Sequence, residues 1–466
     1  MDMSTDSLAM APQISLFAGA VITLLVGSFL PRARQWVSRA LAVAALIACS
    51  SAAIAALVGA PRRVFEGTFA ADDTTSIAAL IICSATLLVI ALGVDELRGS
   101  DRESEAYVLL LLASLGALLM AGTTDLLVLI VAFLLASIPL YALIGLARTP
   151  DAAEATLKTY LLGALFGIGL MLGVTIVYGA GGATTYAELA QVLPDISPVI
   201  VGVGVVAVLG ALLFKAGAVP AHFWVPDAAQ GASTWAAAFA TTVPKVGGLV
   251  AMYRLFDEVD PGIEWPLLIA VVAAVTMTLG NLAALNQSDP RRLLGWSTVS
   301  QAGYLLLPVA VAGGSDLASS SLLLYLAAYA VTNVTAFAVI AALPELTTLS
   351  DYRGLARRHP WLAGALAISL LSLVGTPPTA VFIGKLTTFT AAWDGGFGWL
   401  VAIAAVNTVA SLFYYLRWLA PVFATGQINR EFTDPRPAGM RAAIVGAVVI
   451  LVLGIGSGAL GTMSVQ

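Results

Sequence analysis

The chain has 466 residues, of which 59% are hydrophobic and 11% are charged, and its mean hydropathy is +0.95. A water-soluble fold of this length cannot bury so much apolar surface, so the composition predicts an all-α polytopic membrane protein. The net charge is only −5, and no basic run suits nucleic acid. Because the sequence has no Gly-rich phosphate loop and no Cys or His cluster, we expect it to hold no metal and no redox cofactor.

Fourteen apolar segments of roughly 20 residues follow one another along the chain, and each has the length that crosses a bilayer core. They lie near residues 11–30, 38–59, 74–94, 105–122, 124–146, 158–178, 197–216, 232–256, 264–285, 292–311, 316–342, 360–388, 396–420 and 440–461. Between the sixth and seventh segments, Thr185 and Glu188 form a capping-box pattern. This pattern predicts a short amphipathic helix in the membrane surface, with Tyr186, Leu189 and Leu193 on its apolar face.

The distribution of basic residues predicts the orientation of these segments, because Lys and Arg gather on the cytoplasmic side. If the N-terminus lies outside, 16 of the 22 basic residues fall on the cytoplasmic side, three Arg fall outside and three Lys fall within the membrane. The opposite orientation inverts that ratio. The start of the chain has no basic residue and does not resemble a cleaved signal peptide. We therefore expect a multi-pass protein of the bacterial inner (plasma) membrane with both termini outside.

Lys215, Lys245 and Lys385 lie inside apolar segments. A Lys at the centre of a membrane helix costs about 2.5–3.5 kcal/mol on insertion scales. The chain has 18 Arg and 4 Lys, yet three of the four Lys occupy these costly positions. Arg keeps its proton in practice, whereas a desolvated Lys can lose it. The choice of Lys therefore favours proton transfer over a purely structural role, in which the lysines would pair or reach toward the membrane surface.

Two of the apolar segments contain helix-breaking residues next to a membrane lysine. Gly217 and Pro220 follow Lys215 in the seventh segment, and the Pro377–Pro378 pair precedes Lys385 in the twelfth. Such interruptions free backbone carbonyls and admit water. We expect these carbonyls to lie beside the lysine of the same segment. Paired broken helices are typical of transporters built from inverted repeats.

The predicted organisation has four parts. Two inverted five-helix repeats, with broken helices 7 and 12, follow an N-terminal three-helix segment and precede a C-terminal loop and helix 14. The expected boundaries are 1–104, 105–256, 257–420 and 421–466. Other polar residues at membrane depth could extend a hydrated axis, although each alone is more often a contact between helices. They are Ser297, Ser300, Gln301, Tyr304, Thr332, Asn333, Asn407 and Ser411.

Several sequence stretches resemble the antiporter-like membrane subunits of respiratory complex I. The longest is Lys-Ala-Gly-Ala-Val-Pro-Ala-His-Phe-Trp-Val-Pro-Asp-Ala-Ala-Gln-Gly-Ala-Ser, which starts at residue 215. The resemblance continues in Thr156–Ala164, Val243–Gly248, Leu279–Leu285, Ala302–Leu307 and Gly375–Ala380. It covers residues 107–419 well and the first three segments in outline.

The resemblance implies a proton-translocating membrane-arm subunit of an NADH–quinone oxidoreductase. Lys215, Lys245 and Lys385 would then be its proton-channel lysines, and Lys158 also matches a family position. NADH, FMN, iron–sulfur clusters and quinone would belong to partner subunits. The partners would be other membrane-arm subunits of complex I, together with the lipid bilayer.

Two positions depart from the family pattern. The family usually has Glu three residues before a Ser-x-Pro-x-Tyr motif, but this chain has Leu134 before the motif that starts at Ser137. The resemblance implies that Lys215 thereby loses its expected carboxylate partner. Gln301 also stands where the family often has His. His222 is placed at the cytoplasmic surface, where proton uptake and an interfacial anchor are equally compatible with the sequence.

Two other classes of function share the same sequence features. One is a subunit of a multi-subunit cation/proton antiporter, which the lack of a deep carboxylate for Na⁺ disfavours. The other is a structural paralogue whose proton path has degenerated.

Overall fold

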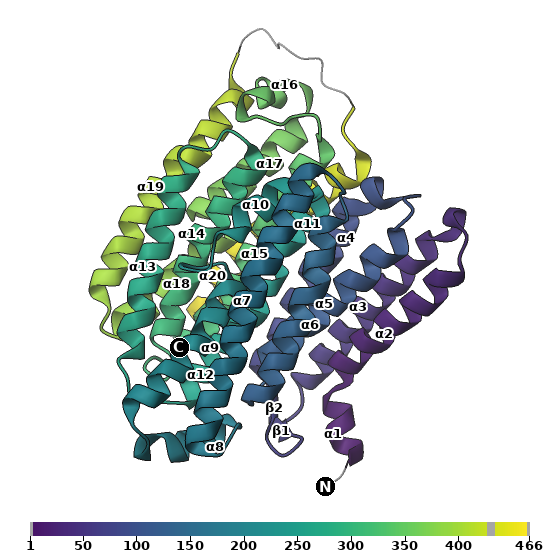
Figure 1. The fold of residues 1–466 in the computed structure, drawn as a ribbon. Coiled ribbons are helices and arrows are strands. Elements are labelled where there is room, and N and C mark those ends of the chain that lie inside the picture. Colours follow the sequence, from purple (N-terminus) through teal and green to yellow (C-terminus); the bar gives the residue numbers. More distant parts are fainter. Residues whose placement is uncertain (1–2, 426–433, 464–466) are drawn as a thin grey trace.

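The computed structural model describes residues 3–425 and 434–463, and its elements form a bundle of long helices (Figure 1). The N-terminal helices are α1 (Met3–Ala9), α2 (Ala11–Phe29), α3 (Trp36–Ala56) and α4 (Asp73–Leu97), with the 3-10 helix η1 (Arg32–Arg34) before α3. Two short antiparallel strands, β1 (Arg62–Val64) and β2 (Phe69–Ala71), form a hairpin between α3 and α4. The α2 and α3 helices lie at one edge of the bundle.

The next helices form the first half of the central bundle. They are α5 (Glu103–Gly122), α6 (Leu126–Gly145), α7 (Pro150–Gly181), α8 (Tyr186–Val192), α9 (Pro198–Ala216), α10 (Trp224–Gly231), α11 (Thr234–Ala240) and α12 (Val243–Glu258), with the 3-10 helix η2 (Leu193–Asp195) after α8. Thr185 caps the start of α8 as expected, because its hydroxyl accepts a hydrogen bond from Glu188 N, but the Glu188 carboxylate accepts from the Thr185 hydroxyl and not from its backbone N–H, so only half of the capping box forms. However, Tyr186 and Leu189 are buried against the bundle instead of facing lipid.

The remaining helices form the second half. They are α13 (Trp265–Ala284), α14 (Pro290–Ala310), α15 (Ala318–Ala342), α16 (Leu355–Arg358), α17 (Pro360–Val374), α18 (Ala380–Asp394), α19 (Gly398–Phe423) and α20 (Pro437–Met463), with the 3-10 helix η3 (Leu349–Tyr352) before α16. The α20 helix packs against α15, α17 and α4, so the last described helix joins the second half to the N-terminal helices.

Eleven helices within the described residues are long and apolar enough to cross a membrane. Each corresponds to one of the expected apolar segments. The three other expected segments correspond to α11 with α12, to α14, and to α17 with α18. These three are either interrupted or rich in polar residues, as Lys245, Lys385 and Gln301 illustrate. The chain is therefore an all-α polytopic membrane protein.

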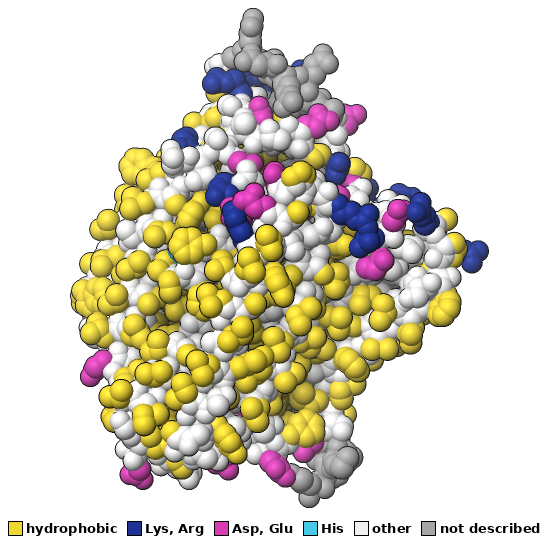
Figure 2. Space-filling view, viewed as in Figure 1, with side chains coloured by type: hydrophobic (Ala, Val, Ile, Leu, Met, Phe, Trp, Pro, Cys, Tyr) yellow, Lys and Arg dark blue, Asp and Glu magenta, His cyan; other side chains and the backbone are white. Residues whose placement is uncertain are grey.

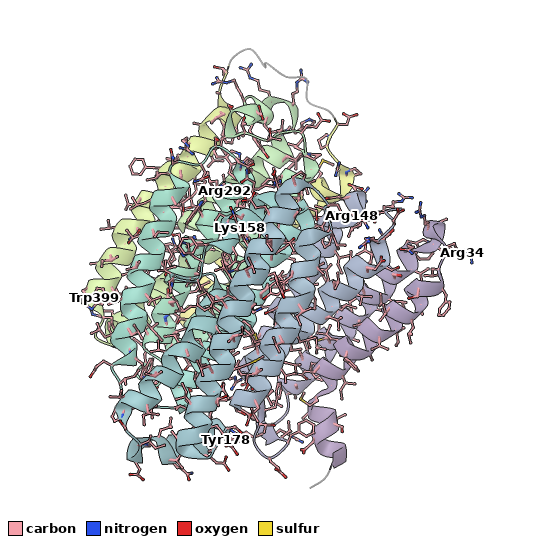
Figure 3. All side chains as sticks on the ribbon, viewed as in Figure 1. Arg34, Arg148, Lys158, Tyr178, Arg292 and Trp399 are labelled. Carbon is pink, nitrogen blue, oxygen red and sulfur yellow. The ribbon has the colours of Figure 1, made fainter. Side chains whose placement is uncertain are left out.

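Side-chain polarity divides the molecule into an apolar belt and two polar ends. Figure 2 shows Lys and Arg gathered toward one end, with a broad hydrophobic surface below them. Arg34, Arg148, Lys158 and Arg292 lie toward this end, hereafter the basic end, whereas Tyr178 lies at the opposite end (Figure 3). Buried apolar side chains form one continuous core through both halves. Cys49 and Cys83 are free thiols within that core.

Candidate functional site

Lys215 lies in the last turn of α9 and is almost fully buried, with 1% of its surface exposed. Its Nζ donates a hydrogen bond to Ser137 Oγ of α6 at 2.5 Å. The same ammonium lies 4.7 Å from the ring centroid of Phe133 and 5.9 Å from that of Phe214. A hydroxyl and two aromatic faces therefore stabilise this cation.

The α9 helix ends directly after Lys215, where Gly217 adopts a left-handed conformation with φ of 70°. The peptide bond between Val219 and Pro220 is cis. The freed carbonyl of Ala216 accepts a hydrogen bond from Lys245 Nζ of α12. The expectation that Lys215 would lie beside these carbonyls is therefore wrong, because the Lys215 side chain turns toward α6. The lysine of the neighbouring helix stabilises the end of α9 instead.

The second break has the same construction. The α17 helix ends at Val374, Gly375 has a φ of 92°, and the Pro377–Pro378 peptide bond is cis. Lys385 Nζ of α18 donates a hydrogen bond to Val374 O at 2.9 Å. The same nitrogen lies 3.4 Å from Thr408 Oγ1 of α19 and 4.1 Å from the ring centroid of Tyr304.

Each break thus places an ammonium group against the C-terminal carbonyl of a half-helix. The C-terminal end of a helix carries partial negative charge, so it stabilises a cation without a carboxylate. The glycine at each break leaves the space that the lysine fills. A Cβ on Gly217 would lie 2.8 Å from Lys245 Nζ, and a Cβ on Gly375 would lie 2.9 Å from Lys385 Cδ.

Among the described residues, no ion pair includes Lys215, Lys245 or Lys385. Leu134, at the position where the resemblance expects Glu, is partly buried on α6, one helical turn before Ser137. The ammonium groups are therefore held by hydroxyls, carbonyls and aromatic faces. Such partners can remain in place when a lysine gives up its proton, because none of them carries a charge that the ammonium must balance.

Lys158 lies at the basic end, on α7, and its side chain is half-exposed. Its Nζ contacts Asp227 Oδ2 of α10 at 2.8 Å and Glu154 at 2.6 Å. Arg292 of α14 contacts the other Asp227 oxygen at 2.6 Å. Asp227 therefore joins helices from both halves at the point where the segment after the first break returns to the surface.

His222 lies in the turn between α9 and α10 and is only 2% exposed. Its ring packs against Phe223 at 4.2 Å and against Trp296 of α14 at 5.6 Å between centroids. The expectation that His222 would lie at the surface is therefore wrong, because its ring is enclosed between α10 and α14.

Gln301 lies in α14 and is fully buried. Its amide nitrogen donates to Leu373 O, near the end of α17, and its amide oxygen accepts from the Tyr325 hydroxyl at 2.5 Å. Gln301 thus contacts both the second break and α15. Unlike the His that the family often has here, its amide does not titrate near neutral pH.

One face of α15 lies between the second break, which it reaches through Gln301, and the turn between α11 and α12. Tyr325, Tyr329 and Asn333 follow one another at intervals of four residues, so they share a helix face. The Tyr329 hydroxyl donates to Thr241 O at 2.8 Å, and Asn333 Nδ2 donates to Thr241 Oγ1 at 2.9 Å. Tyr329 and Tyr325 were not recognised from the sequence, although their spacing on one apolar helix could have indicated them.

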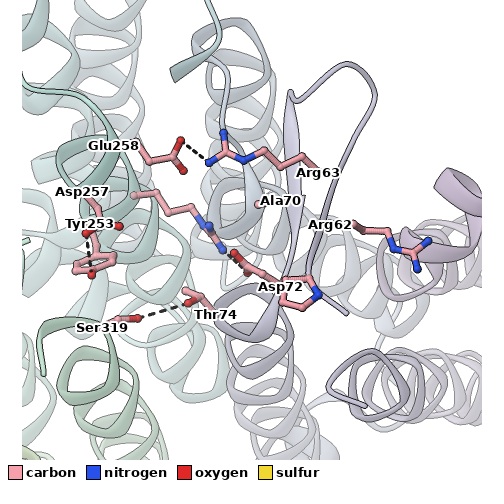
Figure 4. A pocket seen from close by; sticks show the side chains of 11 residues that line it. Arg62, Arg63, Ala70, Asp72, Thr74, Tyr253, Asp257, Glu258 and Ser319 are labelled. Atoms are coloured by element: carbon pink, nitrogen blue, oxygen red, sulfur yellow. Dashed lines mark hydrogen bonds and ion pairs between the residues drawn. The ribbon is translucent and has the colours of Figure 1, made fainter. Parts of the chain in front are cut away.

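A charged cavity of about 480 Å³ lies at the opposite end, beside the β-hairpin (Figure 4). Arg63 pairs with Glu258 at 2.8 Å and Arg254 pairs with Asp72 at 2.5 Å. Burial alone would raise the pKa of Asp72, but the Arg254 hydrogen bond and charge hold that pKa below its usual range. Because these charges neutralise one another, they anchor the hairpin to α4 and α12.

The broken helices, the buried ammonium groups and the charged basic end together define an antiporter-like membrane subunit. The family described as NADH:quinone oxidoreductase/Mrp antiporter matches residues 123–411. This range includes both breaks and all three membrane lysines.

Sequence relatives assign the chain to one family within this class of membrane subunits. The chain is 54% identical over 455 residues to NADH-quinone oxidoreductase subunit N of Mycobacterium sp. (strain JLS), with 97% of each chain covered. It therefore belongs to the family of NADH-quinone oxidoreductase subunit N, the membrane-arm antiporter-like subunit of complex I.

Solved structures have the same fold. Respiratory complex I from Thermus thermophilus with bound aureothin contains a chain with a TM-score of 0.81 and 30% identity, covering 96% of this chain and 97% of that one. The Mrp complex from Dietzia sp. DQ12-45-1b gives a TM-score of 0.84 at 24% identity, covering 99% and 96%. The second likeness shows the fold alone.

Proposed function

We propose that this chain conducts protons through Lys215, Lys245 and Lys385 within the membrane arm of an NADH–quinone oxidoreductase. The observation that carries the proposal is the placement of two ammonium groups on the carbonyl ends of broken helices, with no carboxylate partner among the described residues. A lysine held in this way can exist with or without its proton, whereas an ion pair inside the membrane would oppose the loss.

The redox reaction belongs to other subunits. NADH, FMN, iron–sulfur clusters and quinone are bound by partners in this proposal, and the present chain acts as a non-redox translocase subunit. Its contribution is to take up and release protons as the partners turn over. The other membrane-arm subunits and the surrounding lipid cover its apolar belt.

We further propose fourteen membrane crossings, in which the three interrupted or polar segments join the eleven apolar helices. The matching construction of the two breaks supports two inverted repeats, at residues 105–256 and 257–420. The gathering of Lys and Arg at one end supports a cytoplasmic basic end in a bacterial inner membrane, with both termini outside.

Individual residues have different roles in this scheme. Lys245 and Lys385 act as the titrating relays, and Lys215 is a third relay that is coupled less strongly. Lys158 fixes α10, the helix that follows the first break, to α7 through Asp227. His222, enclosed beside Trp296 of α14, can pass protons inward, and Gln301 positions the second break through Leu373 O.

Replacement of the relays tests the function. Lys245→Ala and Lys385→Ala are expected to reduce proton pumping by the whole complex in reconstituted vesicles, while NADH oxidation persists when a protonophore is present. Lys245→Arg should rescue poorly, because Arg does not release its proton. If Lys245→Arg pumps like the unmodified complex, deprotonation of Lys245 is not part of the mechanism.

Measurements of pumping, assembly and Na⁺-dependent exchange distinguish the proposed function from a structural paralogue and from an antiporter subunit. A structural paralogue would tolerate Lys245→Ala and Lys385→Ala with unchanged pumping and assembly. A subunit of a cation/proton antiporter would instead support Na⁺-dependent proton exchange. The Mrp complex shares the fold, but no group of three or more His, Cys, Asp or Glu suited to a metal ion occurs among the described residues.

A further inference from the structure

Polar side chains line one face of α14 from the depth of Lys385 toward the basic end. Ser297, Ser300, Gln301 and Tyr304 follow one another at intervals of three, one and three residues, which places them on a single helix face. All four are fully buried. The helix begins at Pro290 on the basic end, so Ser297 lies about 10 Å and Tyr304 about 20 Å from its start.

The deep end of this face meets Lys385. The ammonium lies over the Tyr304 ring at 4.1 Å and within 3.4 Å of Thr408 Oγ1. The Thr408 hydroxyl lies 3.3 Å from the Tyr304 hydroxyl. A proton leaving or reaching Lys385 therefore has two hydroxyl groups beside it.

The side chain of Asn281 in α13 contacts the next hydroxyl groups. Its side-chain oxygen accepts from Ser300 Oγ at 2.8 Å and from the Tyr414 hydroxyl of α19 at 3.0 Å. The Asn281 nitrogen is held in turn by Asn407 O and Oδ1, both at 2.9 Å. An amide oxygen has two lone pairs, so Asn281 orients the surrounding hydroxyl protons and leaves their own lone pairs available.

The chain of polar groups continues toward the basic end. The Tyr415 hydroxyl lies 2.5 Å from Ser297 Oγ, and the rings of Tyr414 and Tyr415 are 4.3 Å apart. One turn further along α19, Trp418 Nε1 is buried and has no hydrogen-bond partner in the part of the chain that the structure describes; the same holds for the Tyr352 hydroxyl. Buried polar groups of this kind are usually satisfied by water.

Contacts that only hold helices together do not explain this arrangement. Polar contacts between membrane helices average about 0.6 kcal/mol each, and isolated pairs suffice for that purpose. Here several hydroxyl groups lie between a buried ammonium and orphaned donors near the basic end. Gln301 cannot change its protonation near neutral pH, so hydroxyls and water are the groups on this face that can pass protons.

We propose that Asn281 is a positioning residue that assembles a hydroxyl relay between Lys385 and the basic end of the bundle. In this relay a proton enters from the medium at the basic end, and each hydroxyl accepts a proton on its lone pair and passes its own toward Lys385, with water bridging the hydroxyls that do not touch one another. Asn281 only orients the hydroxyls and carries no proton, and neutral Lys385 becomes the ammonium. Tyr304, Tyr414 and Tyr415 are the members that span the distance. The inference rests on the proposed proton conduction through Lys385.

The test uses the whole complex in inverted membrane vesicles, in which the basic end faces the medium. Tyr414→Phe removes one hydroxyl and keeps the ring, and Asn281→Leu removes the orienting amide at similar size. Tyr186→Phe is the matched control, because this buried tyrosine of α8 has a hydroxyl without a hydrogen-bond partner among the described residues. Proton pumping is measured per NADH oxidised while the pH of the medium is varied.

Both variants are expected to lose roughly tenfold in pumping in alkaline medium, because uptake from the basic end becomes limiting, while water still bridges part of the gap. Acidification of the medium should restore much of the lost pumping, since it raises the proton concentration at the slow step. A variant with merely distorted packing would show the same deficit at every pH. Tyr186→Phe should match the unmodified complex throughout.

Lys385→Ala, measured in parallel, distinguishes failure of the hydroxyl relay from failure of the proposed proton conduction. If Lys385→Ala loses pumping but Tyr414→Phe and Asn281→Leu behave like Tyr186→Phe, the hydroxyl relay is wrong and the proposed function stands. A pH-independent deficit in both variants also overturns the relay. If Lys385→Ala pumps normally, the proposed function itself fails.

Discussion

The three membrane lysines differ in what holds each ammonium group. Lys245 and Lys385 each donate to a carbonyl that a helix break has freed, so the helix end supplies partial negative charge. Lys215 has a hydroxyl and two ring faces instead. Cation–π contacts contribute about 2 kcal/mol when desolvated, which is less than a buried carboxylate partner provides. Lys215 is therefore the lysine whose charge is least supported.

Exchange of Leu134 for Glu tests this difference. Leu134→Glu places a carboxylate one turn from Ser137, the partner of Lys215, so the new side chain should ionise and pair with the ammonium. We expect this variant to assemble. Lys215→Ala should reduce proton pumping less than Lys385→Ala does. Proton-to-electron ratios and the amount of assembled complex measure both effects.

A matched control is Leu135→Glu, which adds a carboxylate at the adjacent, also partly buried position of α6. Successive helical residues point about 100° apart, so Leu135 does not share the face of Leu134. This variant should assemble less well. Equal and near-complete loss of pumping in Lys215→Ala and Lys385→Ala would contradict weak coupling of Lys215, unless an acidic residue of an adjacent subunit pairs with it.

At the scale of elements, the half-helices depend on glycine to receive their lysines. Gly217 and Gly375 adopt positive φ values, which residues with a Cβ rarely accept. Each glycine also leaves open the space that a lysine side chain occupies. The same residue thus ends the helix and admits the cation, so helix termination and lysine placement are coupled.

Gly375→Ala is expected to impair pumping through displacement of Lys385. The new Cβ would lie 2.9 Å from Lys385 Cδ, and the left-handed conformation would cost roughly 1–2 kcal/mol. Gly364→Ala in the same helix, α17, is the control, because its Cβ meets no atom within 4 Å and alanine favours a helix interior by roughly 0.5–1 kcal/mol. Thermal stability and pumping of the purified complex report the two effects. Normal pumping by Gly375→Ala would show that the position of Lys385 is not critical.

Across the whole molecule, the positions of the helix breaks were predictable from the sequence. The side chains from distant helices that meet at each site were not. Gly and Pro interrupt a helix through their own backbones, so both breaks could be placed from the sequence. Which lysine reaches a freed carbonyl depends on how distant helices pack, and the expectation for Lys215 failed for that reason. Asn281 and Tyr414 are 133 residues apart, and neither was singled out from the sequence. The apolar face of α8 was expected to meet lipid, but the bundle covers it.

Without its partner subunits, the chain is not expected to exchange Na⁺ for protons. The three membrane lysines take part in no ion pair among the described residues, and no cluster of acidic or His ligands within the described chain suits a cation. In the proposed mechanism the chain exchanges no Na⁺ for protons, and redox turnover in other subunits supplies its driving force. Expression of the chain alone in a bacterial strain that lacks Na⁺/H⁺ antiporters should therefore leave salt tolerance unchanged. An antiporter expressed from the same plasmid is the positive control, and membrane insertion of the chain is verified in parallel. Robust growth in high salt with this chain alone would identify it as an autonomous antiporter instead.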